Sequence, residues 1–220
     1  MKLLLASQSP RRRELIALLG LPFTALAADA DEESVTNPDP AVNVVETAVL
    51  KSAVIQTQLA AKQERTLIVT ADTIVALAGH MLNKPEDVAE AKCMLINLRH
   101  RTHEVHTGYV LTDIQSGQVI RGVHTARVTM RNYSDEEIET YVASGDPLDK
   151  AGAYAIQHPT FRPVAQLDGC FLSVMGLPVC DLILALQPFG LAEMADVSAV
   201  VHAHQNTPCP ILNRIMTAQS

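Results

Sequence analysis

The chain has 220 residues, of which 48% are hydrophobic and 19% charged, and its formal net charge is −7. This composition predicts a globular protein with a substantial core and excludes a largely disordered one. Aromatic residues are scarce and basic residues are dispersed, so we expect no nucleic acid polymer as partner. No apolar run is long enough to span a membrane and no signal peptide is visible, so we expect a cytoplasmic protein.

The first motif joins a short apolar strand at residues 2–6 to a helix. Ser9 is a favourable N-cap, Pro10 suits the first helical position, and Gly20 marks the end. The first turn carries three arginines, where the helix dipole disfavours cations. A bound anion would reverse this penalty, whereas the alternative is a solvated basic turn. We favour an anion site formed by Ser7, Ser9, Arg11, Arg12 and Arg13.

A carboxylate interrupts the most apolar stretch of the chain. Residues 66–77 read as a buried strand with Asp72 and Thr73 at its centre. An unpaired buried carboxylate is very costly, so Asp72 is expected to face a cleft, a metal or a cation. A structural aspartate at a strand bulge is the alternative.

Further elements follow from hydrophobic periodicity and turn signals. The sequence predicts helices at 41–63, at 86–98 (led by Pro85) and at 134–145, and a last helix that ends at about residue 186. It also predicts an antiparallel hairpin of strands 103–113 and 118–130 and a strand at 170–175. Residues 146–157 are expected to form a loop that approaches a ligand. We therefore expect an α/β protein with a mixed twisted sheet, flanking helices and two lobes around a central cleft. Lys51, Lys84 and Lys150 would point into that cleft together with acidic residues near Glu32. Such a combination of cations and carboxylates suits phosphoryl chemistry with a divalent metal.

The histidines and cysteines give no metal-site pattern. His103 and His106 fall on opposite faces of a strand and read as structural or surface residues. The four cysteines, Cys93, Cys170, Cys180 and Cys209, contain no CxxC pair, so buried thiols are expected, with neither disulfides nor a zinc knuckle. His202, His204 and Cys209 are not expected to form a ligand set.

From residue 1 to about 186 the chain resembles the Maf family of nucleoside triphosphate pyrophosphatases. The motifs that carry the resemblance occur in order: Ala6-Ser7-Gln8-Ser9-Pro10-Arg11-Arg12, Asp31-Glu32, Lys51, Ala71-Asp72-Thr73-Ile74-Val75, Lys84-Pro85, Thr102-His103-x-Val105-x-Thr107-Gly108, Asp149-Lys150-Ala151-Gly152-Ala153-Tyr154-x-Ile156-Gln157 and Gly176-Leu177-Pro178. Each motif is weak alone, and the ordered set is specific. Residues 187–220 form a C-terminal extension for which no role is predicted.

The resemblance implies a Maf/ITPase-like fold and cleavage of a nucleoside triphosphate between its α and β phosphates, with Mg²⁺ or Mn²⁺ as cofactor. It implies Asp72 as proton acceptor and Glu32 as its acidic partner at the metal, with Glu33 as the alternative. The arginines and Ser7, Ser9 and Lys150 would bind phosphates, while Lys51 and Lys84 neutralise developing charge. Whether Asp72 is base, metal ligand or both stays open, and a homodimer is possible.

Substrate preference is expected to follow three positions, Arg11, Thr73 and Gln157. Within the family these residue types resemble a subtype that prefers dTTP and UTP, whereas the sister subtype carries Trp, Gln and Glu and prefers 7-methyl-GTP. The alternatives are the sister activity or a non-catalytic nucleotide-binding regulator linked by name to septum formation. Two departures stand out, because His158 and His100 occupy positions where the family usually has glycine.

Overall fold

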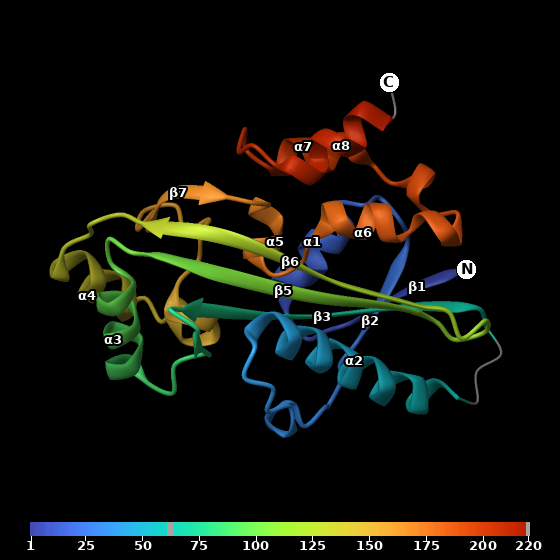
Figure 1. Ribbon diagram of the computed structural model, residues 1–220, viewed down its shortest axis with the longest axis horizontal. Helices are drawn as coiled ribbons and strands as arrows, with labels where there is room; N and C mark the ends of the chain where they lie inside the picture. Colours follow the sequence, from blue (N-terminus) through green and yellow to red (C-terminus); the bar gives the residue numbers. More distant parts are fainter. Residues whose placement is uncertain (61–63, 219–220) are drawn as a thin grey trace.

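A computed structural model describes residues 1–60 and 64–218 of the chain. Its centre is one mixed sheet in the order β2-β1-β3-β5-β6-β7, with β4 paired to β3 (Figure 1). β1 runs parallel to both β2 and β3, and the remaining pairs are antiparallel. The strands within the described residues are β1 (Lys2–Ala6), β2 (Phe23–Leu26), β3 (Thr66–Leu77), β4 (His80–Leu82), β5 (Thr102–Asp113), β6 (Val119–Met130) and β7 (Val164–Asp168).

Helices cover both faces of this sheet and one of its ends (Figure 1). Short 3₁₀ turns connect them at Glu32–Ser34, Asp146–Asp149, Ala151–Ala153, Gln187–Phe189 and Ala192–Met194. The α-helices of the described residues are α1 (Pro10–Ala17), α2 (Pro40–Leu59), α3 (Val88–Leu98), α4 (Asp135–Ala143), α5 (Phe171–Met175), α6 (Val179–Ala185), α7 (Val197–Ala203) and α8 (Pro210–Ala218).

Alternate side chains along β1 pack against different helices on the two faces of the sheet. Leu3 and Leu5 belong to the core under α1, α5 and α6, whereas Leu4 and Ala6 pack with Ile55 of α2 on the other face. Successive strand residues point to opposite faces, so a strand buried on both faces is apolar throughout. This accounts for the near-continuous apolar runs of β1 and β3.

β3 is long enough to pass through two hydrophobic cores. Its first half contributes to the core beneath α1 and α6, and its second half contributes Val75 and Leu77 to a separate core with α3 and α4. Asp72 and Thr73 lie between the two halves and are only partly buried. The predicted two-lobed α/β architecture is confirmed, and its cleft crosses β3 at the residues that sequence analysis singled out.

Most predicted elements are confirmed, one is wrong in type, and two differ from the prediction at one end. The strand at 66–77, the antiparallel hairpin and the capped helix beginning after Ser134 occur as expected. The helix at 86–98 starts at Val88 instead, because Asp87 caps it and Pro85 lies outside. The predicted strand at 170–175 is helix α5, since a short apolar run between glycines does not distinguish strand from helix. Residues 61–63 of the predicted helix 41–63 lie outside the described residues, and α2 ends at Leu59.

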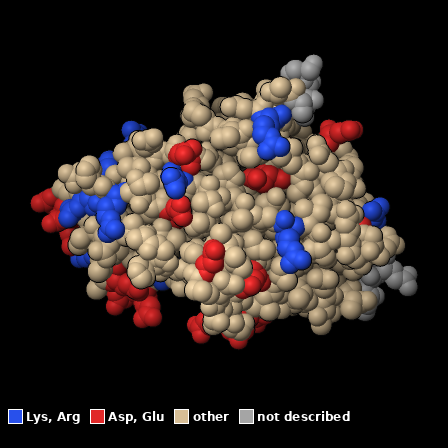
Figure 2. Space-filling view, in the orientation of Figure 1, with Lys and Arg blue, Asp and Glu red and all other residues tan. Residues whose placement is uncertain are grey.

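The C-terminal extension packs against the main core instead of projecting from it. Val200, Leu212 and Ile215 are buried with residues of α1 and α6, and Figure 1 shows α7 and α8 stacked over α6. Among the described residues, no helix combines the length and apolarity needed to cross a membrane. On the face drawn in Figure 2, acidic and basic side chains are interspersed, without an extended basic surface.

Candidate active site

Four of the five residues predicted to form an anion site at the start of α1, namely Ser7, Ser9, Arg11 and Arg12, line one cleft. Ser9 caps the helix by accepting a hydrogen bond from the Arg12 amide at 3.4 Å. The buried Ser7 side chain accepts from the Ser9 amide at 3.2 Å, which fixes the loop that precedes the helix. Both serines and Arg12 line the cleft, so free backbone N–H groups and a cation meet there.

Two hydrogen bonds anchor the Arg12 guanidinium in the cleft. Its Nε donates to the Gly176 carbonyl at 2.8 Å, and its Nη2 donates to Thr73 Oγ1 at 3.2 Å. Thr107 uses its only hydroxyl hydrogen on the Ser173 carbonyl (2.9 Å), so Thr73 donates to Thr107 across 3.2 Å and remains free to accept from Arg12. Burial lowers the pKa of Arg12, and the nearby charges of Asp72 and Glu32 oppose that shift.

The two neighbouring arginines take different positions. Arg11 lines the mouth of the cleft, and its Nη1 bonds Asp149 Oδ2 at 3.1 Å. Burial raises the pKa of Asp149, but hydrogen bonding from Lys150 and the charge of Arg11 outweigh it and give a net lowering. Arg13 is exposed and is not among the cleft-lining residues. The structure therefore brings together two of the three predicted arginines.

Asp72 shares a cation with Glu32. Lys51 Nζ lies 2.8 Å from Asp72 Oδ1 and 2.9 Å from Glu32 Oε2, and Arg12 Nη2 approaches the same Asp72 oxygen at 3.9 Å. Within the described part of the chain, Asp72 Oδ2 has no hydrogen-bond partner. Lys51 is buried, so the ion pair with Asp72 is little screened by solvent. Asp72 thus faces both a cleft and cations, as predicted.

The register of β3 against α2 creates this arrangement. Asp72 points to the α2 face with Thr70, whose hydroxyl donates to the Ala48 carbonyl at 2.7 Å, while Thr73 points to the α1 face. Gly108 pairs with Asp72 in the neighbouring strand. A Cβ at Gly108 would lie only 2.6 Å from the Val44 carbonyl of α2. Glycine is required there because α2 must approach closely for Lys51 to reach Asp72.

The remaining predicted residues line a cleft of about 1090 Å³. Lys84 is exposed at its edge and forms no ion pair with any described residue. Gln157 contributes to the opposite wall, where its side chain makes no hydrogen bond within the described ranges. Lys150 differs from expectation: it is buried, and its three N–H donors are used by the Asp146 carbonyl and by Asp146 and Asp149 carboxylates at 2.5–2.8 Å. It therefore braces the 146–150 loop.

The carboxylates of Glu32 and Asp72 suit a hard divalent cation. Both converge on one cationic position, which the Lys51 ammonium now holds. Mg²⁺ and Mn²⁺ prefer oxygen ligands and commonly use one or two carboxylates together with substrate phosphates and water. The donor set therefore fits the metal that sequence analysis expects. Glu33, the alternative ligand, also lines the cleft but forms no ion pair within the described residues.

Comparison with known proteins places this cleft in a family. A family model described as Maf-like protein matches residues 2–189. The chain belongs to the Maf family. It is 43% identical over 192 residues to a protein of Moorella thermoacetica named dTTP/UTP pyrophosphatase, covering 86% of this chain and 96% of that one. Proteins of the same name from Chlorobium luteolum (41%, covering 84% and 95%) and Geobacter sulfurreducens (40%, covering 86% and 97%) are also similar.

Both departures from the Maf pattern have a structural explanation. His158 turns away from the cleft: its Nδ1 accepts from the Phe161 amide at 3.0 Å, and its ring packs edge-on against Tyr141 at 4.7 Å. Gln157 still lines the cleft, whereas His158 contacts residues outside it. His100 adopts φ of +57°, the left-handed conformation that glycine would adopt without strain.

Some residues of this Maf site were not assigned from the sequence. Thr107 and Gly176 lie within the quoted motifs, but only the fold shows that they anchor Arg12. Asp146 and Asp149 precede Lys150 in the sequence, and the concentration of charged residues at 146–150 is the only sequence feature that points to them. Their role depends on a loop conformation that local patterns do not encode.

We expect His103, which bonds Tyr154 of the core formed with α3 and α4, to make the stability of the protein pH-dependent. Its ring is buried, Nε2 bonds the Tyr154 hydroxyl at 2.8 Å, and burial lowers its pKa to about 4. Between about pH 6.5 and pH 4 the unfolded chain binds more protons at this site, so its contribution to stability is present near neutrality and is lost on acidification. Between pH 7 and pH 5 the wild type should therefore lose about 2 kcal/mol more unfolding free energy than His103→Gln. Urea unfolding at the two pH values measures this difference. The control is His80→Gln, at an exposed histidine, which should lose as much unfolding free energy between pH 7 and pH 5 as the wild type. If His103→Gln also loses as much as the wild type, His103 is not the group responsible.

The cysteines require one correction. Cys170, Cys180 and Cys209 are buried free thiols, as predicted, while Cys93 is exposed. The structure also shows a grouping that sequence analysis did not expect: His204 and Cys209 converge on Cys170 and Cys180, whereas His202 is exposed and lies outside the group.

Proposed function

We propose that this chain hydrolyses dTTP and UTP to the nucleoside monophosphate and pyrophosphate. The observation that carries the proposal is that Asp72, its carboxylate held by Lys51, faces the same cleft as the helix start with Arg12. A base beside an anion site is the requirement for hydrolysis of a bound phosphoanhydride. The alignments cover 95% and 96% of two relatives named dTTP/UTP pyrophosphatase. This near-complete coverage supports the same reaction and substrates for this chain.

In this mechanism the residues position the phosphates and move one proton. A water oxygen attacks the α phosphorus, its proton passes to Asp72, and the bond to the bridging oxygen breaks to release pyrophosphate. Lys51 orients the Asp72 carboxylate through Oδ1, which leaves Oδ2 for the water or for a metal. Arg12 and Lys84 stabilise the negative charge that develops on the phosphate oxygens.

The proposed reaction includes Mg²⁺ or Mn²⁺ held by Glu32 and Asp72 with the substrate phosphates. When bound, such a cation neutralises phosphate charge and lowers the pKa of a coordinated water. Glu32 is the more exposed of the two carboxylates, with a side-chain exposure of 51% against 15% for Asp72. Lys51 binds both, so it also keeps them together when no metal is present.

Substrate choice is tested by measuring turnover of several nucleoside triphosphates by the wild type and by a variant at Gln157. An amide offers both a donor and an acceptor to a pyrimidine edge, whereas a carboxylate offers only acceptors. Gln157→Glu should lower turnover of dTTP and UTP by about tenfold or more, because the amide donor proposed to pair with the pyrimidine is lost. The melting temperature should not fall, because Gln157 is only partly buried. Gln166→Glu, which adds the same charge on β7 outside the cleft, should leave turnover unchanged.

The wild-type protein is expected to release pyrophosphate fastest from dTTP and UTP and slowly from 7-methyl-GTP. The reverse order would show that the altered 157–158 loop has rebuilt the pocket. Absence of pyrophosphate release from every triphosphate, with Mg²⁺ and with Mn²⁺, would favour a nucleotide-binding regulator instead.

A further inference from the structure

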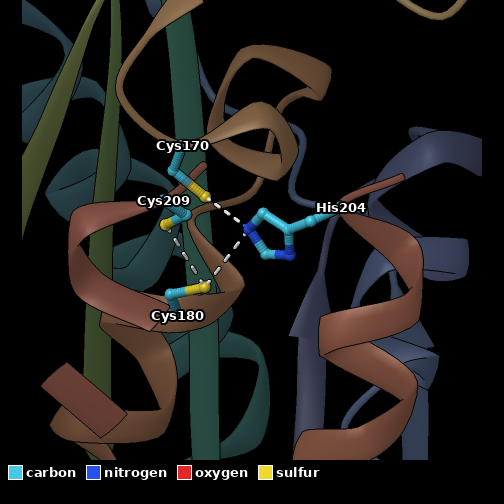
Figure 3. A group of neighbouring side chains, drawn as sticks. All are labelled: Cys170, Cys180, His204 and Cys209. Carbon is cyan, nitrogen blue, oxygen red and sulfur yellow. Dashed lines mark hydrogen bonds between the residues drawn. The ribbon is translucent and has the colours of Figure 1, made fainter. Parts of the chain in front are cut away.

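Four buried side chains outside the cleft converge on one point (Figure 3). Cys170 precedes α5, Cys180 lies in α6, His204 follows α7, and Cys209 precedes α8. Their ligand atoms, three sulfurs and one imidazole nitrogen, all lie within 4.8 Å of one another. The nucleotide chemistry proposed above uses none of them.

Three of the six distances between the ligand atoms are close to those of a tetrahedral metal site. A zinc ion with Zn–S bonds of about 2.3 Å separates its sulfur ligands by about 3.8 Å, and sulfur from nitrogen by about 3.6 Å. Here Cys209 Sγ lies 3.9 Å from Cys180 Sγ, and His204 Nε2 lies 3.4 Å from Cys170 Sγ and 3.6 Å from Cys180 Sγ. The sulfurs are much too far apart for a disulfide, whose S–S bond is about 2.05 Å.

Neighbouring groups orient two of these ligands. His204 Nδ1 lies 2.7 Å from the Val200 carbonyl, which can only accept, so Nδ1 carries the hydrogen and the lone pair of Nε2 faces the sulfurs. A backbone carbonyl behind a metal-binding histidine fixes its tautomer in this way. The Leu212 amide donates to Cys209 Sγ at 3.5 Å, and such a bond stabilises a thiolate.

Burial indicates a structural metal instead of a catalytic one. Cys170 and Cys180 are 0% exposed, His204 is 1% and Cys209 is 2% exposed. Four protein ligands leave no open coordination position for a substrate, and thiolates with an imidazole select zinc over the harder Mg²⁺ or Mn²⁺.

We propose that Cys170, Cys180, His204 and Cys209 bind one Zn²⁺ that fastens the C-terminal extension to the Maf domain. The first two ligands lie within the residues that match the family model, and the other two lie beyond residue 189. The ion would therefore join two ligand pairs, Cys170 with Cys180 and His204 with Cys209, that residues 181–203 connect along the chain.

The position of this site also gives it an indirect link to the cleft. The segment between Cys170 and Cys180 contains the Ser173 and Gly176 carbonyls, which accept hydrogen bonds from Thr107 and Arg12. Zinc binding would fix both ends of that segment. Its role is positional, because none of its ligands lines the cleft.

The direct test is the zinc content of the full chain, purified under reducing conditions from cells grown with added zinc. We expect about one zinc per chain in the wild type and less than about a tenth of that in Cys180→Ser and His204→Asn. Cys93→Ser and His202→Asn are matched controls on exposed residues and should retain the metal.

If the two ligand variants fail to fold, the wild type alone decides the question. Co²⁺ exchanged into it should give tetrahedral ligand-field absorption with a thiolate charge-transfer band, and a zinc chelator should lower its melting temperature. A wild-type protein without bound zinc, a cobalt spectrum without the thiolate charge-transfer band, or a Cys180–Cys209 disulfide in peptide mass spectra would overturn the proposal. Zinc binding and pyrophosphate release are measured separately, so failure of one does not imply failure of the other.

Discussion

Replacing Asp72 by asparagine is expected to lower pyrophosphate release from dTTP by two orders of magnitude or more, because the variant loses its general base. The side chain keeps its shape and its place opposite Lys51. Binding of a non-hydrolysable dTTP analogue should therefore remain measurable by calorimetry. Steady-state kinetics at saturating substrate give the turnover directly.

Asp29 provides the control for charge in the same cleft. It also lines the cleft, and it forms no ion pair with any described residue. Asp29→Asn removes one negative charge without removing the proposed base, so its turnover should stay within about threefold of the wild type. If Asp72→Asn behaves like Asp29→Asn, Asp72 is not the base.

Arg12→Lys should reduce kcat/KM for dTTP by about thirtyfold to a thousandfold. Lysine keeps the positive charge but cannot donate at once to the Gly176 carbonyl, to Thr73 and to a phosphate, as the guanidinium fork can. Losing one or two charge-assisted bonds in a partly desolvated site costs about 2–4 kcal/mol of transition-state stabilisation.

Arg13→Lys is the matched control, since Arg13 is the next residue of the same helix turn and is exposed. It should leave kcat/KM unchanged. A similar loss in both variants would show that the helix start acts through its overall charge and not through the anchored Arg12 side chain.

Sequence patterns predicted the central strand and its carboxylate because both have strong local signals. An apolar run with one charge at residue 72 requires either a partner or a cleft, and the structure supplies both. The N-cap at Ser9 and the capping box at Ser134 are also local, and both are confirmed. Family resemblance added the pairing of Asp72 with Glu32, which no local pattern contains.

Other features depend on contacts between distant segments. Lys150 appeared to be a phosphate contact, but the fold of its own loop surrounds it with Asp146 and Asp149. The ligand group of Cys170, Cys180, His204 and Cys209 lacks regular spacing, and it forms only when α7 and α8 pack over α6. The sequence could not reveal that packing, because it depends on contacts between segments that lie far apart in the chain.

The products formed from UTP in ¹⁸O-labelled water test the central claim most directly. Attack at the α phosphorus predicts UMP that carries the label, together with unlabelled pyrophosphate, as resolved by phosphorus NMR and mass spectrometry. Formation of UDP and inorganic phosphate would contradict the proposed pyrophosphatase activity, and label in the pyrophosphate would contradict attack at the α phosphorus.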